Sequence, residues 1–321
     1  MAKPKVAFYW CASCGGCEEA VVDLAEGILK VVEAVDIVFW PVALDFKYHH
    51  VERMADGEIA VCLFNGAIRN SEQREIAELL RRKSQVMVAH GACACWGGIP
   101  ALGNVANRAE VFDRVYFSSP STDNPERVTP QTSTRVPEGE LKLPAFFDTV
   151  FALDQVVPVE FYMPGCPPVV DQTLAVVEAV MAGALPPAGS VVGAGSKTVC
   201  EECKRTTSDE KKVKRFRRIH LADDLDPDKC LLEQGVVCVG PATRSGCGGK
   251  CTNVGMACRG CYGPAGGVTD QGAKMISAIA AVIDSDDPEE VDRIVATIDD
   301  PLGYVYRFGM AGSSLRRVKL A

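Results

Sequence analysis

Fifteen cysteines, set in two groups, constrain this chain of 321 residues more than any other feature. Seven are spread through the first half, and the other eight crowd between Cys200 and Cys261. The N-terminal MAKPKVAFYW lacks the apolar stretch of a secretory signal and carries no twin-arginine leader, so we expect a cytoplasmic location. Cytoplasmic thiols stay reduced, and clustered cysteines there indicate metal or redox chemistry rather than disulfides.

Composition narrows the classes of function. The net charge of −8 argues against a nucleic-acid-binding protein, which needs basic surface for its phosphate contacts. The sequence has no apolar run of about 18 residues, so we expect no transmembrane helix. The length leaves room for about two domains.

The first 185 residues alternate short apolar runs with amphipathic segments. This alternation predicts a doubly wound, mostly parallel α/β sheet of flavodoxin-like outline. The polar stretch from Ser118 to Glu140 is interpreted as a long loop, solvated or lying on a partner. We expect strands at Val6–Trp10, Asp36–Ala43, Glu58–Phe64, Gln85–Ala89 and Val156–Tyr162, and helices at residues 18–35, Glu72–Arg82 and Val169–Met181.

The character of the sequence changes from about Pro186. Glycine, proline, cysteine and charged residues dominate as far as Gly267, and such a stretch would bury too little apolar area to fold alone. Metal ligation is the expected substitute for a core. Two short helices, Gly272–Ile283 and Val291–Ile298, are predicted to close the chain. We therefore divide the chain into a flavodoxin-like domain, residues 1–185, and an irregular, cysteine-rich C-terminal domain, residues 186–321.

Three of the predicted strands carry cysteine just after their carboxyl ends. Cys14 and Cys17 follow the first strand, Cys93 follows the fourth and Cys166 follows the fifth. These ends converge on one crevice in a doubly wound sheet, so we expect the four thiols to meet. Four thiolates suit a 4Fe–4S cluster or a zinc ion. The alternatives are a redox-active pair at Cys14 and Cys17, and buried apolar roles for the other two.

Five segments, in this order, resemble the small subunit of nickel–iron hydrogenases: WCASCGGCEE, GACACWGG, MPGCPP, CLLEQGVVCVGPATRSGCGGKC and CRGCYGP. The style of these motifs is closest to the cytosolic group that includes the methyl-viologen-reducing, or coenzyme F420-non-reducing, hydrogenases. The resemblance implies an oxidoreductase subunit that acts with hydrogen as donor, while the nickel–iron centre lies in a partner large subunit. Three iron–sulfur clusters would carry electrons between that centre and an external acceptor. A heterodisulfide reductase, a flavin-based bifurcating module and a ferredoxin are all open as acceptors.

The resemblance also assigns ligands to the three clusters. A 4Fe–4S cluster nearest the large subunit, called proximal, would use the four cysteines at the strand ends. Cys251 stands where many relatives have proline and a 3Fe–4S centre, so a medial 4Fe–4S cluster of lower potential is expected. Cys200 stands where many relatives have histidine, so the distal cluster is expected to be 4Fe–4S with four cysteines. The ligand sets are Cys14, Cys17, Cys93 and Cys166 (proximal), Cys247, Cys251, Cys258 and Cys261 (medial), and Cys200, Cys203, Cys230 and Cys238 (distal).

This assignment leaves three cysteines as non-ligands: Cys11, Cys62 and Cys95. Cys11 precedes Cys14 by three residues and could replace it as a ligand. Glu19 matches a family glutamate on the proton route between the proximal cluster and the active site, a role that requires a carboxylate near the subunit interface. Its structural alternative is a favourable negative charge at the start of a helix.

Other conspicuous residues are given structural roles. His90 is interpreted as a packing histidine at a strand end, and Trp96 as a shield beside the proximal cluster. The basic run Lys211–Arg218 is either a solvated loop or a dock for an acidic partner.

Three other functions share parts of this pattern. The small subunit of a coenzyme F420-reducing hydrogenase would look broadly similar. The cluster-binding subunit of complex I shares the N-terminal fold, but the eight C-terminal cysteines argue against it. A zinc-stabilised scaffold without electron transfer is the alternative from another class, although the spacing of Cys230, Cys238 and Cys247 does not match a zinc ribbon.

Overall fold

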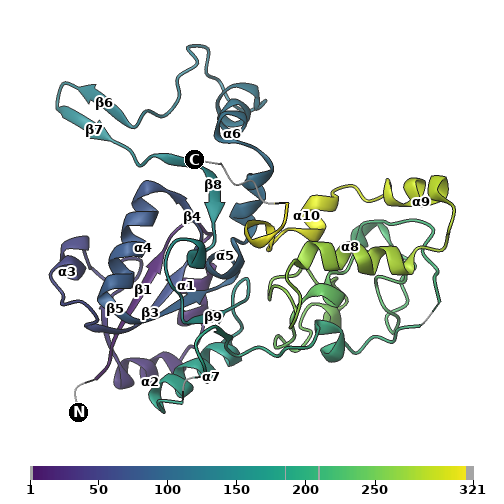
Figure 1. The fold of residues 1–321 in the computed structure, drawn as a ribbon, viewed down its shortest axis with the longest axis horizontal. Coiled ribbons are helices and arrows are strands. Elements are labelled where there is room, and N and C mark those ends of the chain that lie inside the picture. The colour runs from purple at the N-terminus through teal and green to yellow at the C-terminus, as the bar shows by residue number, and fades with distance from the viewer. Residues whose placement is uncertain (1–2, 185, 209, 316–321) are drawn as a thin grey trace.

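A six-stranded parallel sheet forms the centre of the N-terminal half (Figure 1). The computed structural model describes residues 3–184, 186–208 and 210–315. The strand order is β10–β9–β5–β3–β1–β2, and each neighbouring pair is parallel, which confirms the predicted doubly wound α/β fold. The strands are β1 (Lys5–Trp10), β2 (Asp36–Phe39), β3 (Ile59–Asn65), β5 (Ser84–His90), β9 (Phe161–Met163) and β10 (Ser190–Val191).

Helices cover both faces of this sheet. Strand β3 shows why, because Cys62 and Phe64 point into one apolar cluster while Val61 and Leu63 point into the other. A strand buried on both faces reads as a continuous apolar run, as IAVCLFN does. One face packs against α1 (Gly16–Val22), α2 (Gly27–Ala34) and α7 (Val170–Met181), and the other against α3 (Tyr48–Glu52), α4 (Ser71–Lys83) and α5 (Ala92–Trp96).

Three expected elements are shorter or broken. The strand expected over Val156–Tyr162 is β9, which begins only at Phe161, because residues 156–160 are irregular and include Pro158. The single helix expected over residues 18–35 is two helices, α1 and α2, because the chain turns at residues 23–26 and Ala25 takes a φ of 50°. Strand β2 ends at Phe39, two residues before Pro41, rather than at Ala43, since proline has no amide to continue the ladder.

The expectation of a continuous loop from Ser118 to Glu140 is wrong in its last part. A hairpin of β6 (Ser133–Val136) and β7 (Gly139–Lys142) stands away from the sheet (Figure 1). The VPEG turn was a readable signal, because proline and glycine at these positions favour a tight turn. The segment that contains this hairpin begins with α6 (Arg108–Asp113) and ends with β8 (Phe146–Phe151). Strand β8 pairs antiparallel with β4 (Ile68–Asn70).

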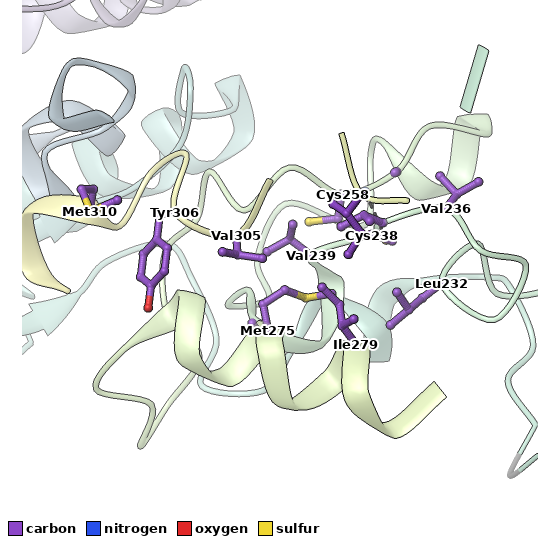
Figure 2. Packing of buried hydrophobic residues seen from close by; sticks show 14 of the residues in the cluster. Leu232, Val236, Cys238, Val239, Cys258, Met275, Ile279, Val305, Tyr306 and Met310 are labelled. Atoms are coloured by element: carbon purple, nitrogen blue, oxygen red, sulfur yellow. Dashed lines mark hydrogen bonds between the residues drawn. The ribbon is translucent and has the colours of Figure 1, made fainter. Parts of the chain in front are cut away.

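The C-terminal region consists largely of irregular loops held against three helices: α8 (Gln271–Val282), α9 (Pro288–Val295) and α10 (Pro301–Val305). Met275 and Ile279 of α8 pack in the same cluster as Cys238 and Cys258 (Figure 2). Strand β10 joins the N-terminal sheet, although it follows residue 185, and the division at that residue stays a prediction. Within the described residues, no helix has both the length and the apolar character that a membrane crossing requires.

Candidate metal centres

The loops after β1, β5 and β9 bring the four proximal cysteines together at the carboxyl edge of the sheet. The thiol of Cys17 lies close enough to Cys14, Cys93 and Cys166 for their charges to interact. Burial first, and then the neighbouring thiols, raise the pKa of Cys93 to about 12. Four thiolates therefore need positive charge among them, which a metal centre supplies.

The backbone lies directly against these thiols. A Cβ at Gly91 would collide with the Sγ of Cys17, and a Cβ at Gly98 would collide with the Sγ of Cys93. Both glycines also have positive φ, 84° and 56°, which side-chain-bearing residues rarely adopt. The glycines of GACACWGG thus leave room for four thiols around a bulky group.

A second set of four cysteines lines one cavity in the C-terminal region. Its walls include Cys200, Cys203, Cys230 and Cys238. Burial first, and then the three other thiols, raise the pKa of Cys200 to about 12. Thr206 joins the loops that carry these cysteines, because its carbonyl accepts from the amide of Cys230 at 2.8 Å. The structure therefore brings together all four residues that the resemblance assigns to the distal cluster.

The medial cysteines lie between these two sets. The thiol of Cys261 interacts with those of Cys247 and Cys251, and the thiol of Cys258 interacts with that of Cys261. Burial is the main cause of the raised pKa of Cys261, about 12.

Glu202, which the sequence pattern did not single out, fixes the loop around Cys247. Its two carboxylate oxygens accept from the amides of Gly246 at 2.7 Å and Gly248 at 2.9 Å. Its position between Cys200 and Cys203 was the available signal, because a carboxylate flanked by two ligands lies near the metal centre.

The three sets form a row. At one junction, the thiol of Cys261 lies near Cys166, because the thiol of Cys166 raises the pKa of Cys261 and the backbone of Cys166 lowers it. At the other, the amide of Cys258 donates to the Sγ of Cys238 at 3.3 Å, and Figure 2 shows these two residues side by side. The medial set thus lies near the proximal set at Cys166 and is hydrogen-bonded to the distal set at Cys238.

Among the described residues, no three side chains of His, Cys, Asp and Glu come close enough to ligate one metal ion. The four distal cysteines nevertheless line one cavity.

The three cysteines that are assigned to no cluster have other surroundings. Cys11 interacts with Glu72 and Cys62, and both Cys11 and Cys62 belong to the apolar cluster on the α4 face of the sheet. Cys95 lies beside the proximal set, but its thiol donates to the carbonyl of Ala89 at 3.1 Å.

Helix α1 turns its two glutamates in opposite directions. Glu18 is buried and accepts a hydrogen bond from the indole of Trp40, while Glu19 is exposed. Burial raises the pKa of Glu18 to about 7 against the lowering effect of that hydrogen bond. Glu19, the residue predicted for proton transfer, therefore has its carboxylate on the surface beside the proximal set.

His90 is buried near Cys93, and Trp96 is half-buried there. His90 has no exposed surface, and burial lowers its pKa to about 4, so its ring is neutral at pH 7. Trp96 stacks on Tyr162 with ring centroids 5.5 Å apart. These positions agree with the packing roles expected from the sequence.

Most basic residues of the run Lys211–Arg218 form ion pairs with carboxylates of the same chain. Exposed ion pairs of this kind contribute little to stability and leave little free charge for docking. The pairs are Lys211–Asp286, Lys212–Glu210, Lys214–Asp284, Arg217–Asp224 and Arg218–Asp299.

Comparison with known proteins identifies relatives of both halves. The family described as NADH ubiquinone oxidoreductase, 20 Kd subunit, matches residues 14–180. The iron–sulfur subunit of the F420-non-reducing hydrogenase of Archaeoglobus profundus is 38% identical over 98% of this chain and 98% of its own length. The corresponding subunit of the F420-non-reducing hydrogenase of Methanothermobacter marburgensis is 37% identical over 95% of this chain and 94% of its own.

A solved structure shares the fold. It is a recombinant NiFeSe hydrogenase from Desulfovibrio vulgaris Hildenborough in the oxidized state, with a TM-score of 0.51 and 16% identity. The match covers 82% of this chain and 94% of that chain, so the likeness of fold extends into the cysteine-rich region.

Proposed function

Because the chain belongs to the family of F420-non-reducing hydrogenase iron–sulfur subunits, we propose that it carries electrons between the nickel–iron site of a large subunit and an external acceptor. The chain is a subunit of a hydrogenase, an oxidoreductase whose active site lies in the partner subunit. Relatives that match almost its whole length are named F420-non-reducing, which argues against the F420-reducing alternative.

The row of three thiol sets is the observation that carries this proposal. Each set would hold one 4Fe–4S cluster: proximal, medial and distal, with the twelve cysteines assigned above. A cluster of this kind takes up and releases one electron without large rearrangement. The electrostatic interaction of Cys166 with Cys261, and the hydrogen bond from Cys258 to Cys238, support short steps from one cluster to the next.

The chain's own residues supply ligation, insulation and a proton site. Twelve thiolates would bind the clusters, and the buried side chains around Cys238 and Cys258 would exclude water from the middle of the row. Glu19 would pass protons at the surface of α1, beside the proximal set, during hydrogen oxidation or evolution.

The proposal includes two partners and a place in the cell. The large subunit would cover the proximal set, and a heterodisulfide reductase, a flavin-based bifurcating module or a ferredoxin would exchange electrons with the distal set. A reducing, cytoplasmic location goes with this proposal, because cluster ligands must be reduced thiolates.

Iron and acid-labile sulfide analysis of the anaerobically purified complex tests the cofactors. About twelve iron atoms and twelve sulfides for this chain, after subtraction of the large subunit's iron, are expected from three four-iron clusters. Two or three zinc ions without sulfide would support the zinc scaffold instead.

A further inference from the structure

Arg205 lies in the wall of the distal cavity, together with Thr207 and the four distal cysteines. Its guanidinium donates to three backbone carbonyls. Nη1 bonds the carbonyl of Lys229 at 2.9 Å and that of Asp226 at 3.1 Å, and Nε bonds that of Thr252 at 3.3 Å. These bonds fix the position of the positive charge.

The carbonyls belong to the loops that carry cluster ligands. Lys229 directly precedes Cys230, a distal cysteine, and Thr252 directly follows Cys251, a medial cysteine. Arg205 itself lies two residues after Cys203. Three loops therefore meet at one guanidinium, which can bond them together because its donors form a rigid planar fork.

The charge of Arg205 is not cancelled by a contacting acid. Within the described part of the chain, no carboxylate oxygen makes an ion pair with Arg205, although Asp226 is near enough for its pKa to be lowered by it. The carboxylate of Asp226 contacts Lys229 instead, at 2.9 Å. Arg218, by contrast, pairs with Asp299 at 2.7 Å.

We propose that the charge of Arg205 raises the reduction potential of the distal cluster. This inference rests on the proposed function, because it requires a cluster between the four distal cysteines. Reduction adds one electron to the cluster and breaks no bond, so the reduced form is the more negative one. A fixed cation at the cavity wall stabilises that form more than the oxidised form.

The raised potential favours one direction of electron transfer. A distal cluster with a raised potential draws electrons away from the medial cluster and toward the outer end of the row. The effect depends on charge and not on the hydrogen bonds alone, so lysine should preserve it while glutamine should remove it.

Potentiometric EPR of the anaerobically purified hydrogenase complex measures this effect. Arg205→Gln should shift the distal midpoint potential to more negative values, with about a tenfold lower ratio of reduced to oxidised cluster at a fixed potential. Arg205→Lys should stay near the wild type. Arg244→Gln is the matched control, because Arg244 also donates to two carbonyls, of Gly195 and Pro264, but does not line the distal cavity.

Other outcomes are decisive as well. An unshifted distal signal in Arg205→Gln, or an equal shift in Arg205→Lys, overturns the inference. If Arg205→Gln loses the distal iron, a second variant tests the inference. Thr207→Lys adds a positive charge to the wall of the same cavity. A raised distal potential in Thr207→Lys supports the inference, and an unchanged potential contradicts it. Failure of the proposed function itself looks different, because the wild type would then show no distal signal and too little iron.

Discussion

Cys251 is the residue at which the medial centre can be changed with the least effect on the fold. Its side chain is exposed, and the motif resemblance places it where a proline would go with a 3Fe–4S centre. Cys251→Pro should convert the medial centre to a 3Fe–4S cluster with a higher potential, because one thiolate is lost. EPR of the oxidised complex reports the new signal directly.

Cys62→Ala is the control for this change, because Cys62 is a fully buried cysteine that belongs to no set. It should leave all cluster signals as in the wild type. A medial signal unchanged in Cys251→Pro would show that the ligand assignment is wrong.

Glu19 tests the proton route. Glu19→Gln should slow hydrogen–deuterium exchange by the complex, because an amide cannot relay protons, while all three clusters stay reducible by dithionite. Glu26→Gln, at an exposed glutamate just before α2, should exchange at the wild-type rate. Equal rates in Glu19→Gln and the wild type contradict the role assigned to Glu19.

The roles of residues could be predicted where metal ligation requires a particular spacing of cysteines. They were harder to predict where helix packing determines which side chain is buried. The convergence of Cys14, Cys17, Cys93 and Cys166 follows from strand ends alone, and the structure brings these thiols together. The opposite exposure of two adjacent glutamates did not follow, because it depends on how α1 sits on Trp40. Arg205 could not be found either, since its partners are backbone carbonyls of distant loops.

At the scale of elements, α8 is the support of the cluster-bearing loops. Met275 is fully buried in the cluster that contains Cys238 and Cys258 (Figure 2). Ile276 of the same helix is 51% exposed. Met275→Ala should cost about 2–5 kcal/mol, because it leaves a cavity, and should lower the content of distal and medial iron.

Ile276→Ala should have little effect on either quantity, since its side chain leaves no cavity when shortened. Thermal unfolding of the complex and iron analysis measure both variants. Equal losses of iron in the two variants would contradict the supporting role of α8.

Element prediction succeeded for the central strands and the long amphipathic helix α4, and failed for the extents of β2 and β9 and for segments where a turn interrupts the hydrophobic period. Strands β3 and β5 lie within a residue or two of the expected positions, because both faces of the sheet demand apolar side chains. The break at residues 23–26 is not visible, since Val21 and Ile28 continue a helical spacing across it. The β6–β7 hairpin carries mostly exposed residues, so no hydrophobic pattern indicates it.

At the scale of the whole molecule, the two halves are joined where electrons would pass. The proximal set belongs to the sheet and the other two sets belong to the C-terminal loops, and Cys166 and Cys261 make the junction. A flavodoxin-like sheet supplies one converging edge, which is enough for one cluster. The irregular region adds a core in which helices and, in our account, metal centres replace a sheet.

The central claim is that three clusters stand in series in this one chain. Spin integration of EPR spectra from the fully reduced complex tests it most directly. The account predicts about three spins for this chain, with magnetic coupling between neighbouring clusters, since each reduced 4Fe–4S cluster carries one unpaired spin. A single uncoupled spin, or none, would contradict the account.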